Sequence, residues 1–298
     1  MKGPSQAGRS DTRARTHLRG IVMVTAAFCV LPALDGIAKY LIADFHVVQL
    51  VWARMFFQSI LVAAWLAARG RLKFAPSERP VLLAGAIAVV WLANFPIIFS
   101  LAFLPLADAF ALAMTAPLMV TALSATLLSE RVDRHRWAAV AIGFCGALVI
   151  IRPGLGVFHW AAILPVLTAA LFALYQIGMR RLTTTHTAID LLLYASVAPM
   201  IASSVLVPLF WSSPDGFSWG LMALMGAGAG LGHFLLIAAL DHAPASVLAP
   251  FMYIQLISST LFGLIVFGDF PDTLTILGAA VIVASGLYSL RREYRSNA

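Results

Sequence analysis

Residues 80–130 have the sequence PVLLAGAIAVVWLANFPIIFSLAFLPLADAFALAMTAPLMVTALSATLLSE, and this stretch decides the fold class. It holds two long apolar runs that meet at the Leu104-Pro105-Leu106 turn, and its charged residues are Asp108 and Glu130. A helix of about 20 residues crosses a hydrocarbon core of roughly 30 Å. The stretch therefore predicts two consecutive membrane-spanning helices.

The same pattern extends over the whole chain. Of its 298 residues, 61% are hydrophobic and 11% are charged, whereas soluble domains carry about 25% charged residues. The blocks also lack the polar–apolar alternation of a membrane β-barrel. We predict an all-α integral membrane protein with ten transmembrane helices, at residues 18–41, 47–68, 80–102, 107–128, 137–151, 160–179, 189–210, 218–240, 244–267 and 274–290. The first block is too long for a cleaved signal peptide, so we expect it to be retained.

Basic residues are distributed unequally between the two sides of this topology. Of the 20 Lys and Arg residues, Arg152 falls on one side, Lys39 and Arg54 fall within spans, and all the others fall on the opposite side. Because Lys and Arg are enriched in cytoplasmic loops, both termini are expected in the cytoplasm. The net charge of +7 is thus a feature of topology rather than of nucleic-acid binding. We expect a multi-pass protein of the bacterial inner membrane.

The chain contains an internal repeat. A shift of 139 residues places the third to fifth spans on the eighth to tenth and pairs Asn94 with His233, Leu101 with Leu240, Pro105 with Pro244, Met114 with Tyr253, Thr115 with Ile254, Glu130 with Asp269, Asp133 with Asp272 and Arg152 with Arg291. A shift of 141 residues pairs Lys39 with Arg180. Each half holds an odd number of spans, so the halves are inverted, as in many transporters. We predict two five-helix repeats, at 18–152 and 153–290, between cytoplasmic tails at 1–17 and 291–298.

Short motifs at matching places in the two halves carry a family resemblance. Ser129-Glu130 is followed by Gly143 and Gly146, and Gly268-Asp269 is followed by Gly278 and Gly286. The second copy has Asp for Glu, and Ala139 stands where the first copy would have its leading Gly. Over residues 18–290 the chain resembles the EamA-type branch of the drug/metabolite transporter superfamily, and within it bacterial amino-acid exporters of the YddG type. The resemblance implies export of amino acids and similar metabolites without ATP, through a pathway lined by the first, third, fourth, sixth, eighth and ninth helices.

Charged residues within spans are candidates for function, because each costs about 2.5–3.5 kcal/mol on insertion scales. Asp35 and Lys39 lie four residues apart on the first helix, so they are able to pair, and Arg54 lies towards the same side. These three residues form an outer gate, or contacts for the carboxylate and amine of a zwitterion, or a neutralised cluster near the interface with Lys39 reaching outwards. Asp108 is expected to cap the fourth helix rather than to carry protons.

Polar and aromatic residues in the middle of spans are candidate substrate contacts. Asn94 and His233 match across the repeat, and polar groups at this depth need partners that a water- or substrate-filled cavity supplies. Aromatic rings beside amides and hydroxyls suit an apolar or aromatic amino acid, although each residue alone is also explained by helix packing. The candidate pathway consists of Trp91, Asn94, Phe95, Met114, Thr115, Tyr175, Gln176, His233, Tyr253 and Gln255. Pro96, Pro117 and Pro250 are candidate hinge positions.

Other patterns are weaker. Gly216–Gly220 matches G-x-S-x-G but follows a predicted outer loop at Pro214 and Asp215, instead of the strand that a nucleophile elbow requires. The glycines of 226–232 are expected to allow close helix packing. Cys29 and Cys145 are expected to be buried, with no disulfide framework. We expect no catalytic residues, metal or cofactor, and no ATP-driven step, since Walker and H-E-x-x-H motifs are missing.

The sequence therefore predicts a secondary transporter that exports amino acids by alternating access. Its predicted partners are the small-molecule substrate and the lipid bilayer, and a monomer is compatible with the sequence. A drug or nucleotide-sugar carrier on the same fold is the main alternative. A lipid-modifying membrane enzyme is the alternative from a different class.

Overall fold

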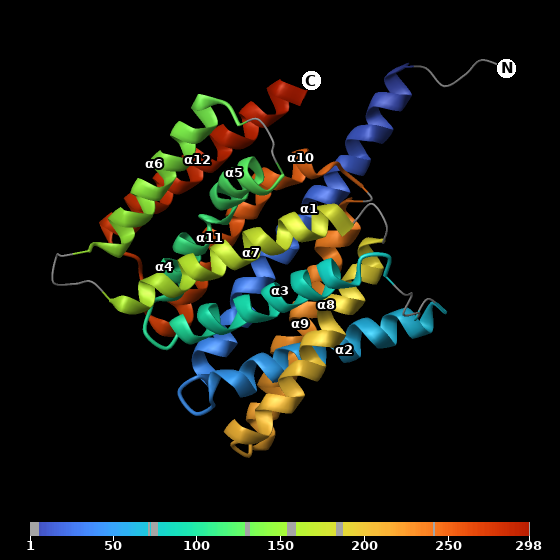
Figure 1. The fold of residues 1–298 in the computed structure, drawn as a ribbon, viewed down its shortest axis with the longest axis vertical. Helices are drawn as coiled ribbons and strands as arrows, with labels where there is room; N and C mark the ends of the chain where they lie inside the picture. The colour runs from blue at the N-terminus through green and yellow to red at the C-terminus, as the bar shows by residue number, and fades with distance from the viewer. Residues whose placement is uncertain are drawn as a thin grey trace.

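The computed structural model describes residues 6–70, 72, 77–128, 132–153, 159–182, 187–240 and 242–297 (Figure 1). Residues 1–5 and the Ser129-Glu130 motif lie outside the described residues. In the described part, ten helical stretches are long and apolar enough to cross a membrane, which confirms the predicted fold class. The elements are α1 (Gln6–Leu41), α2 (Val47–Ala68), α3 (Pro80–Ser100), α4 (Leu106–Ala113), α5 (Ala116–Leu127), α6 (Arg134–Ile151), η1 (Trp160–Ala162), α7 (Ile163–Leu182), α8 (Ala188–Leu206), η2 (Val207–Phe210), α9 (Gly216–Leu240), α10 (Ala245–Leu248), η3 (Ala249–Tyr253), α11 (Ile254–Phe262), η4 (Gly263–Phe267) and α12 (Thr273–Asn297).

The fourth and the ninth spans are interrupted at matched positions. Between α4 and α5 the interruption falls at Met114 and Thr115. In the ninth span, the change from η3 to α11 falls between Tyr253 and Ile254, which are the partners of these residues under the 139-residue shift. A proline occupies one of the first two positions of α5 and of η3, and proline lacks the N–H that continues a helix. By contrast, α3 continues through Pro96.

Helices α6 and α12 are joined at both ends by an ion pair. Asp133 and Asp272 each accept a hydrogen bond from a backbone N–H in the first turn of the helix that follows, α6 and α12 respectively. Arg152, at the end of α6, pairs with Asp272, and Arg292, near the end of α12, lies 3.8 Å from Asp133. The two helices are therefore antiparallel and side by side (Figure 1), as equivalent helices of an inverted repeat should be.

The Arg152–Asp272 pair stays ionised over the pH range of living cells. The hydrogen bond that Arg152 donates lowers the pKa of Asp272 to about 2, from about 3.9 in an unfolded chain. A carboxyl group with a lowered pKa stabilises the fold above its unfolded pKa and loses that contribution as the pH falls towards the folded value. This link between the two halves is therefore lost only in acid below about pH 4.

Glycines let α9 lie close to α1 and α2. A Cβ atom at Gly226 would lie 2.8 Å from the carbonyl oxygen of Arg54, and one at Gly230 would also contact α2. Cβ atoms at Gly228 and Gly232 would each lie 2.7 Å from a leucine side chain of α1. The predicted role of this run in close packing is confirmed, and it fixes α2 and its charged side chain against the bundle.

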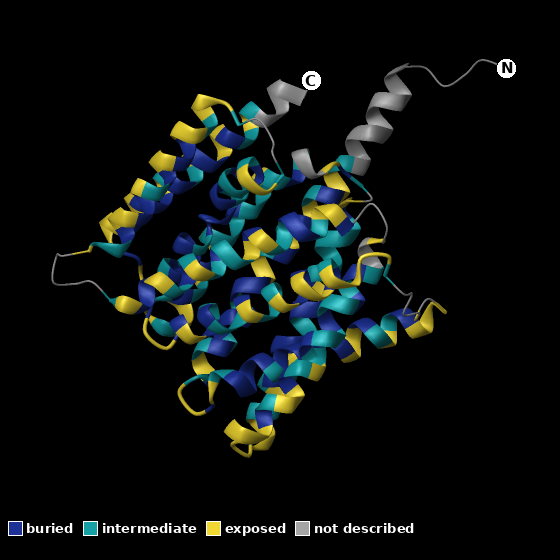
Figure 2. Cartoon of the chain, in the orientation of Figure 1, coloured by how far each residue is buried: buried dark blue, intermediate teal, exposed yellow. Residues whose placement is uncertain are grey.

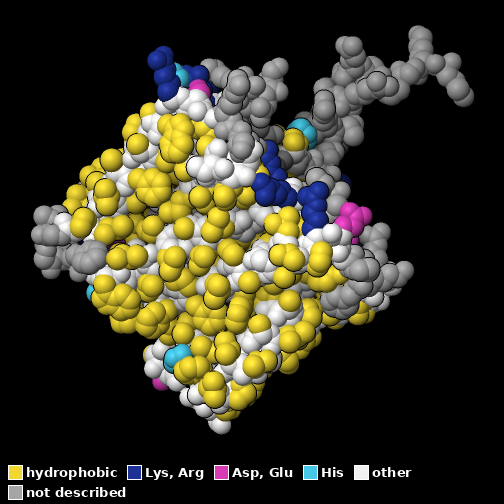
Figure 3. Space-filling view, in the orientation of Figure 1, with side chains coloured by type: hydrophobic (Ala, Val, Ile, Leu, Met, Phe, Trp, Pro, Cys, Tyr) yellow, Lys and Arg dark blue, Asp and Glu magenta, His cyan; other side chains and the backbone are white. Residues whose placement is uncertain are grey.

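The outside of the bundle is apolar. Figure 2 shows exposed residues along the outer faces of the helices, and Figure 3 shows one such face covered with hydrophobic side chains, its visible Lys and Arg near the upper margin. Val81 and Ile265 are 86% and 79% exposed, as expected of side chains that face lipid. Cys29 and Cys145 are also exposed, so the prediction that they are buried is wrong. Lipid tails are as apolar as a protein core, so a thiol suits either environment.

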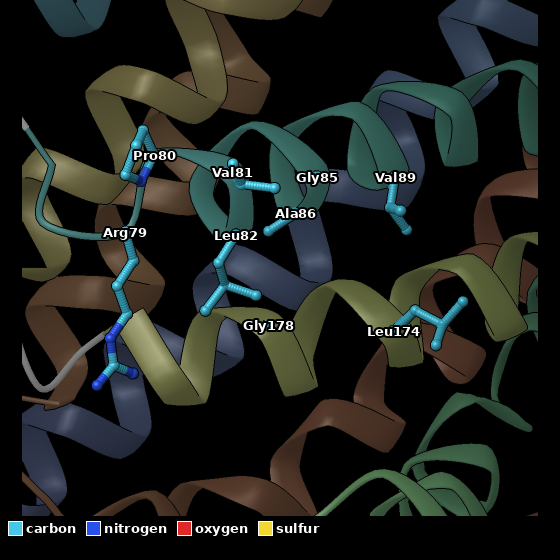
Figure 4. Close-up of a pocket in the computed structure, with 9 residues that line it drawn as sticks. All are labelled: Arg79, Pro80, Val81, Leu82, Gly85, Ala86, Val89, Leu174 and Gly178. Atoms are coloured by element: carbon cyan, nitrogen blue, oxygen red, sulfur yellow. The ribbon is translucent and has the colours of Figure 1, made fainter.

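A groove of about 650 Å³ runs between α3 and α7. Gly85, Ala86 and Gly178 leave room there, and Arg79 lies at one end of an otherwise apolar lining (Figure 4). We call it the lateral groove. It offers polar partners at one end only, so it is a poor site for a polar solute.

Candidate substrate-binding cavity

A cavity of about 330 Å³ lies inside the bundle, between helices of both halves. Side chains from α1, α2, α3, α4 and α5 line it from the first half, and side chains from α7, α8, α9, η3 and α11 from the second. Its volume is near the lower end of the roughly 300–1,000 Å³ found for small-molecule sites. Eight of the predicted site residues line it, namely Asp35, Arg54, Trp91, Asn94, Met114, Tyr175, His233 and Gln255.

One wall of the cavity is charged. The Arg54 guanidinium donates a hydrogen bond from Nη1 to Asp35 Oδ1 at 2.5 Å, and each side chain is 9% exposed. The predicted pairing of Asp35 with Lys39 is therefore wrong, although the two residues lie four apart on α1. The opposite charges of α1 and α2 neutralise each other within the span, which reduces the cost of placing them there.

Aromatic side chains form another part of the wall. The indole N–H of Trp91 donates to Ser203 Oγ at 2.8 Å, which fixes the ring. Phe172 and Tyr175 on α7 lie with their ring centroids 5.7 Å apart. All three of these rings line the cavity, so an apolar or aromatic group would find contacts in the same cavity as the charged wall.

Asn94 and His233, matched across the repeat, both line the cavity. Asn94 Nδ2 donates to Val90 O at 2.7 Å, one turn earlier on α3. His233 Nδ1 lies 2.9 Å from Ala229 O. A carbonyl oxygen only accepts, so Nδ1 carries the hydrogen and Nε2 of the neutral ring is an acceptor. Both residues therefore keep a polar atom free of these helix contacts.

Four predicted contacts lie outside the cavity lining. Phe95 packs on Trp91, with ring centroids 5.5 Å apart. Thr115 is fully buried and donates its hydroxyl to Leu112 O. Gln176 lies in a separate groove between α5 and α7, and Tyr253 is buried against α12.

Lys39 joins three segments at the end of the bundle. Its Nζ atom donates to Asp269 Oδ2 at 2.6 Å and to Leu104 O at 3.2 Å. It also lies 4.9 Å from the ring centroid of Phe267. These contacts, which we call the Lys39 clamp, tie α1 to the turn before α4 and to the end of the ninth span. A side chain held by three partners does not reach freely outwards, so the interpretation of Lys39 as an outward-reaching interface residue does not hold.

Asp108 lies in the first turn of α4, next to the same end. The residue before α4 is Pro105, and no side chain caps the helix start. The expectation that Asp108 caps this helix is therefore wrong, because its Oδ1 atom is buried without a hydrogen-bond partner.

Sequence reasoning missed several lining residues. Gln58 is the most informative of them, since it lies four residues after Arg54 and therefore on the same face of α2. Phe28, Met55, Phe110 and Phe172 add apolar surface. Among the described residues, no group of three or more His, Cys, Asp or Glu side chains is placed to hold a metal ion.

The ten spans, the matched interruptions and the cavity between the halves define a secondary transporter of the membrane. The chain belongs to the EamA-like transporter family, which matches residues 18–152 and again residues 159–291. The resemblance to the drug/metabolite transporter superfamily is thereby confirmed.

Curated relatives carry different cargoes. The chain is 25% identical over 283 residues to an S-adenosylmethionine uptake transporter of Rickettsia felis, and this match covers 95% of this chain and 96% of the relative. It is 33% identical over 217 residues to a riboflavin transporter of Rhizobium johnstonii, and this match covers 72% of this chain and 70% of the relative. It is 26% identical over 271 residues to a pseudopaline exporter of Pseudomonas aeruginosa, and this match covers 89% of this chain and 94% of the relative.

A protein of known crystal structure shares the fold. The two chains superimpose with a TM-score of 0.64, at 19% sequence identity, over 90% of this chain and 94% of that one. At this identity the likeness concerns the fold alone.

Proposed function

We propose that this protein exports amino acids, above all apolar or aromatic ones, from the cytoplasm by alternating access. The cavity carries the proposal, because it lies in mid-span between the two halves and combines a charged wall with an aromatic one. The matched interruptions at Met114–Thr115 and Tyr253–Ile254 supply one joint in each half. Transporters of this kind place their sites at such discontinuous helices.

The proposal includes a location and an orientation. The distribution of Lys and Arg favours the inner membrane with both termini in the cytoplasm. In that orientation the Lys39 clamp lies at the outer end of the cavity. The family and the named relatives are transporters, which supports a role without catalysis.

Other cargoes remain alternatives. The relatives are named for S-adenosylmethionine, riboflavin and pseudopaline, and they include both an uptake carrier and an exporter. A cavity of about 330 Å³ favours an amino acid over a nucleotide sugar or a bulky drug. A lipid-modifying enzyme has no separate observation in its favour.

Efflux from liposomes tests the proposal. Purified protein in liposomes loaded with labelled phenylalanine, methionine or threonine should release at least one of them, measured with and without a pH gradient. Asn94→Ala and His233→Ala should slow that efflux roughly 2- to 10-fold, the effect of losing about one hydrogen bond.

Gln176→Ala is the matched control, because Gln176 lies outside the cavity, and its efflux should equal that of the wild type. Folded protein that releases no amino acid would overturn the assignment. Release of a labelled nucleotide sugar or drug instead would favour the main alternative.

A further inference from the structure

Two side chains on one face of α2 present unsatisfied polar atoms at the cavity. Arg54 is 8% exposed and Gln58 is 4% exposed, and both line the cavity. Arg54 Nε and Gln58 Oε1 are buried without a hydrogen-bond partner. Buried polar atoms are nearly always paired in folded proteins. An exception at two neighbouring positions of one cavity wall points to a ligand.

The orientation of the Gln58 amide follows from its contacts. Ser196 Oγ donates its hydrogen to Leu192 O at 2.8 Å. The same oxygen can then only accept, so the Gln58 atom 3.0 Å away must be the donor Nε2. This leaves Oε1 as the free atom of Gln58, and that atom requires a donor from the ligand.

Arg54 and Asp35 complete the wall. Nη1 of Arg54 is used by Asp35 Oδ1, whereas Nε–H still requires an acceptor. Asp35 Oδ2 forms no hydrogen bond within the described residues, and Asp35 also lines the cavity. The wall thus offers one cationic donor and two acceptors, of which one is anionic.

We propose that Asp35, Arg54 and Gln58 form a subsite for solutes that carry an ammonium and a carboxylate group on the same carbon atom. The carboxylate binds Arg54 Nε, and the ammonium binds Gln58 Oε1 and Asp35 Oδ2. Positions four apart on a helix hold their Cβ atoms roughly 5–6 Å apart, so both side chains reach the cavity from one face of α2. The subsite rests on the proposed amino-acid transport and names the chemistry that selects the cargo.

Charge balance explains why the subsite requires both groups. The Asp35–Arg54 pair has no net charge, and a zwitterion leaves the wall neutral. An anion or a cation of the same size would bring an uncompensated charge into the interior, which is strongly unfavourable. The aromatic wall then contacts whatever side chain the amino acid carries.

Binding to the full-length protein in nanodiscs tests the subsite with three probes that share one apolar body. L-Phenylalanine should bind roughly 10- to 100-fold more tightly than 3-phenylpropionate or 2-phenylethylamine, by titration calorimetry. Gln58→Leu should weaken phenylalanine roughly 10-fold and leave phenylpropionate unchanged, because only the ammonium contact is lost. Ser59→Ala is the control, since its buried hydroxyl also lacks a partner but does not line the cavity, and it should change none of the three affinities.

The outcomes separate the subsite from the transport function. Equal binding of all three probes, or binding of none, would overturn the subsite, and phenylalanine efflux would then still support the transport function. Preferred binding of phenylalanine without efflux would support the subsite and overturn amino-acid export. The comparison of probes uses the wild-type protein, so it does not depend on any variant folding.

Discussion

Asp35→Asn should lower the free energy of unfolding by about 3–5 kcal/mol, because it leaves the Arg54 guanidinium as an unpaired charge inside the bundle. The two side chains are 9% exposed and joined at 2.5 Å. The Nε atom of Arg54 is buried without a hydrogen-bond partner, so no second contact at that atom would compensate for the loss of Asp35. Unfolding in mixed micelles, followed by circular dichroism, measures the loss.

The double variant Asp35→Asn with Arg54→Gln provides the control for this prediction. With both charges removed, most of the lost stability should return, because no ion is left uncompensated. Phenylalanine efflux of the double variant should nevertheless be abolished, since the proposed subsite has lost its cationic donor and its anionic acceptor. A single variant as stable as the wild type would show that the pair is not buried as the structure has it.

Lys39→Met should open the outer end of the cavity, because the Lys39 clamp joins α1 to Leu104 and Asp269. Loss of a charge-assisted hydrogen bond costs about 1.5–3 kcal/mol. If the closed state alone contains this bond, the equilibrium shifts towards the outward-open state by roughly 10- to 100-fold. A membrane-impermeant thiol reagent, applied outside to an Ala113→Cys reporter in the cavity wall, measures the shift. Cys29 and Cys145 must first be replaced, because both are exposed.

Asp44→Asn is the matched control for the clamp. Asp44 is exposed at the same end of α1 and forms no ion pair within the described residues. Its labelling rate should equal that of the parent protein. Equal rates for Lys39→Met and the parent would mean that the clamp does not hold the outer end closed.

The general fold follows directly from the sequence. The length of a span is fixed by the thickness of the bilayer, so apolar blocks reveal their own number and approximate limits. The 139-residue shift also pairs Met114 and Thr115 with Tyr253 and Ile254, and the structure interrupts both spans at those residues. The shift shows which residues are equivalent in the two halves, but the interruptions themselves became visible only in the structure.

Charge partners were harder to predict. Asp35 and Lys39 are near in sequence, but their actual partners are Arg54 and Asp269, the latter 230 residues away. Helix spacing says which side chains share a face and not which neighbouring helix that face meets. Pairing of this kind depends on tertiary packing, such as the close approach of α9 to α2 that Gly226 permits.

Gln58 shows why part of the site was missed. An amide in an apolar span is normally a packing residue, although its place four residues after Arg54 puts Gln58 on the same face of α2. Its role became visible only with the contact to Ser196, which fixes one amide atom and leaves the other unpaired. Conversely, Tyr253 has the kind of side chain expected at a binding site, but it packs against α12.

Anomalous diffraction from crystals grown with 4-bromophenylalanine shows whether the cavity between the two halves binds the amino acid, because the bromine atom locates the ligand independently of its surrounding density. We expect one bromine peak in the cavity, beside Trp91 and Phe172, with the carboxyl group at Arg54 and the amino group at Gln58. A bromine peak in the lateral groove between α3 and α7, with the cavity unchanged, would contradict the account.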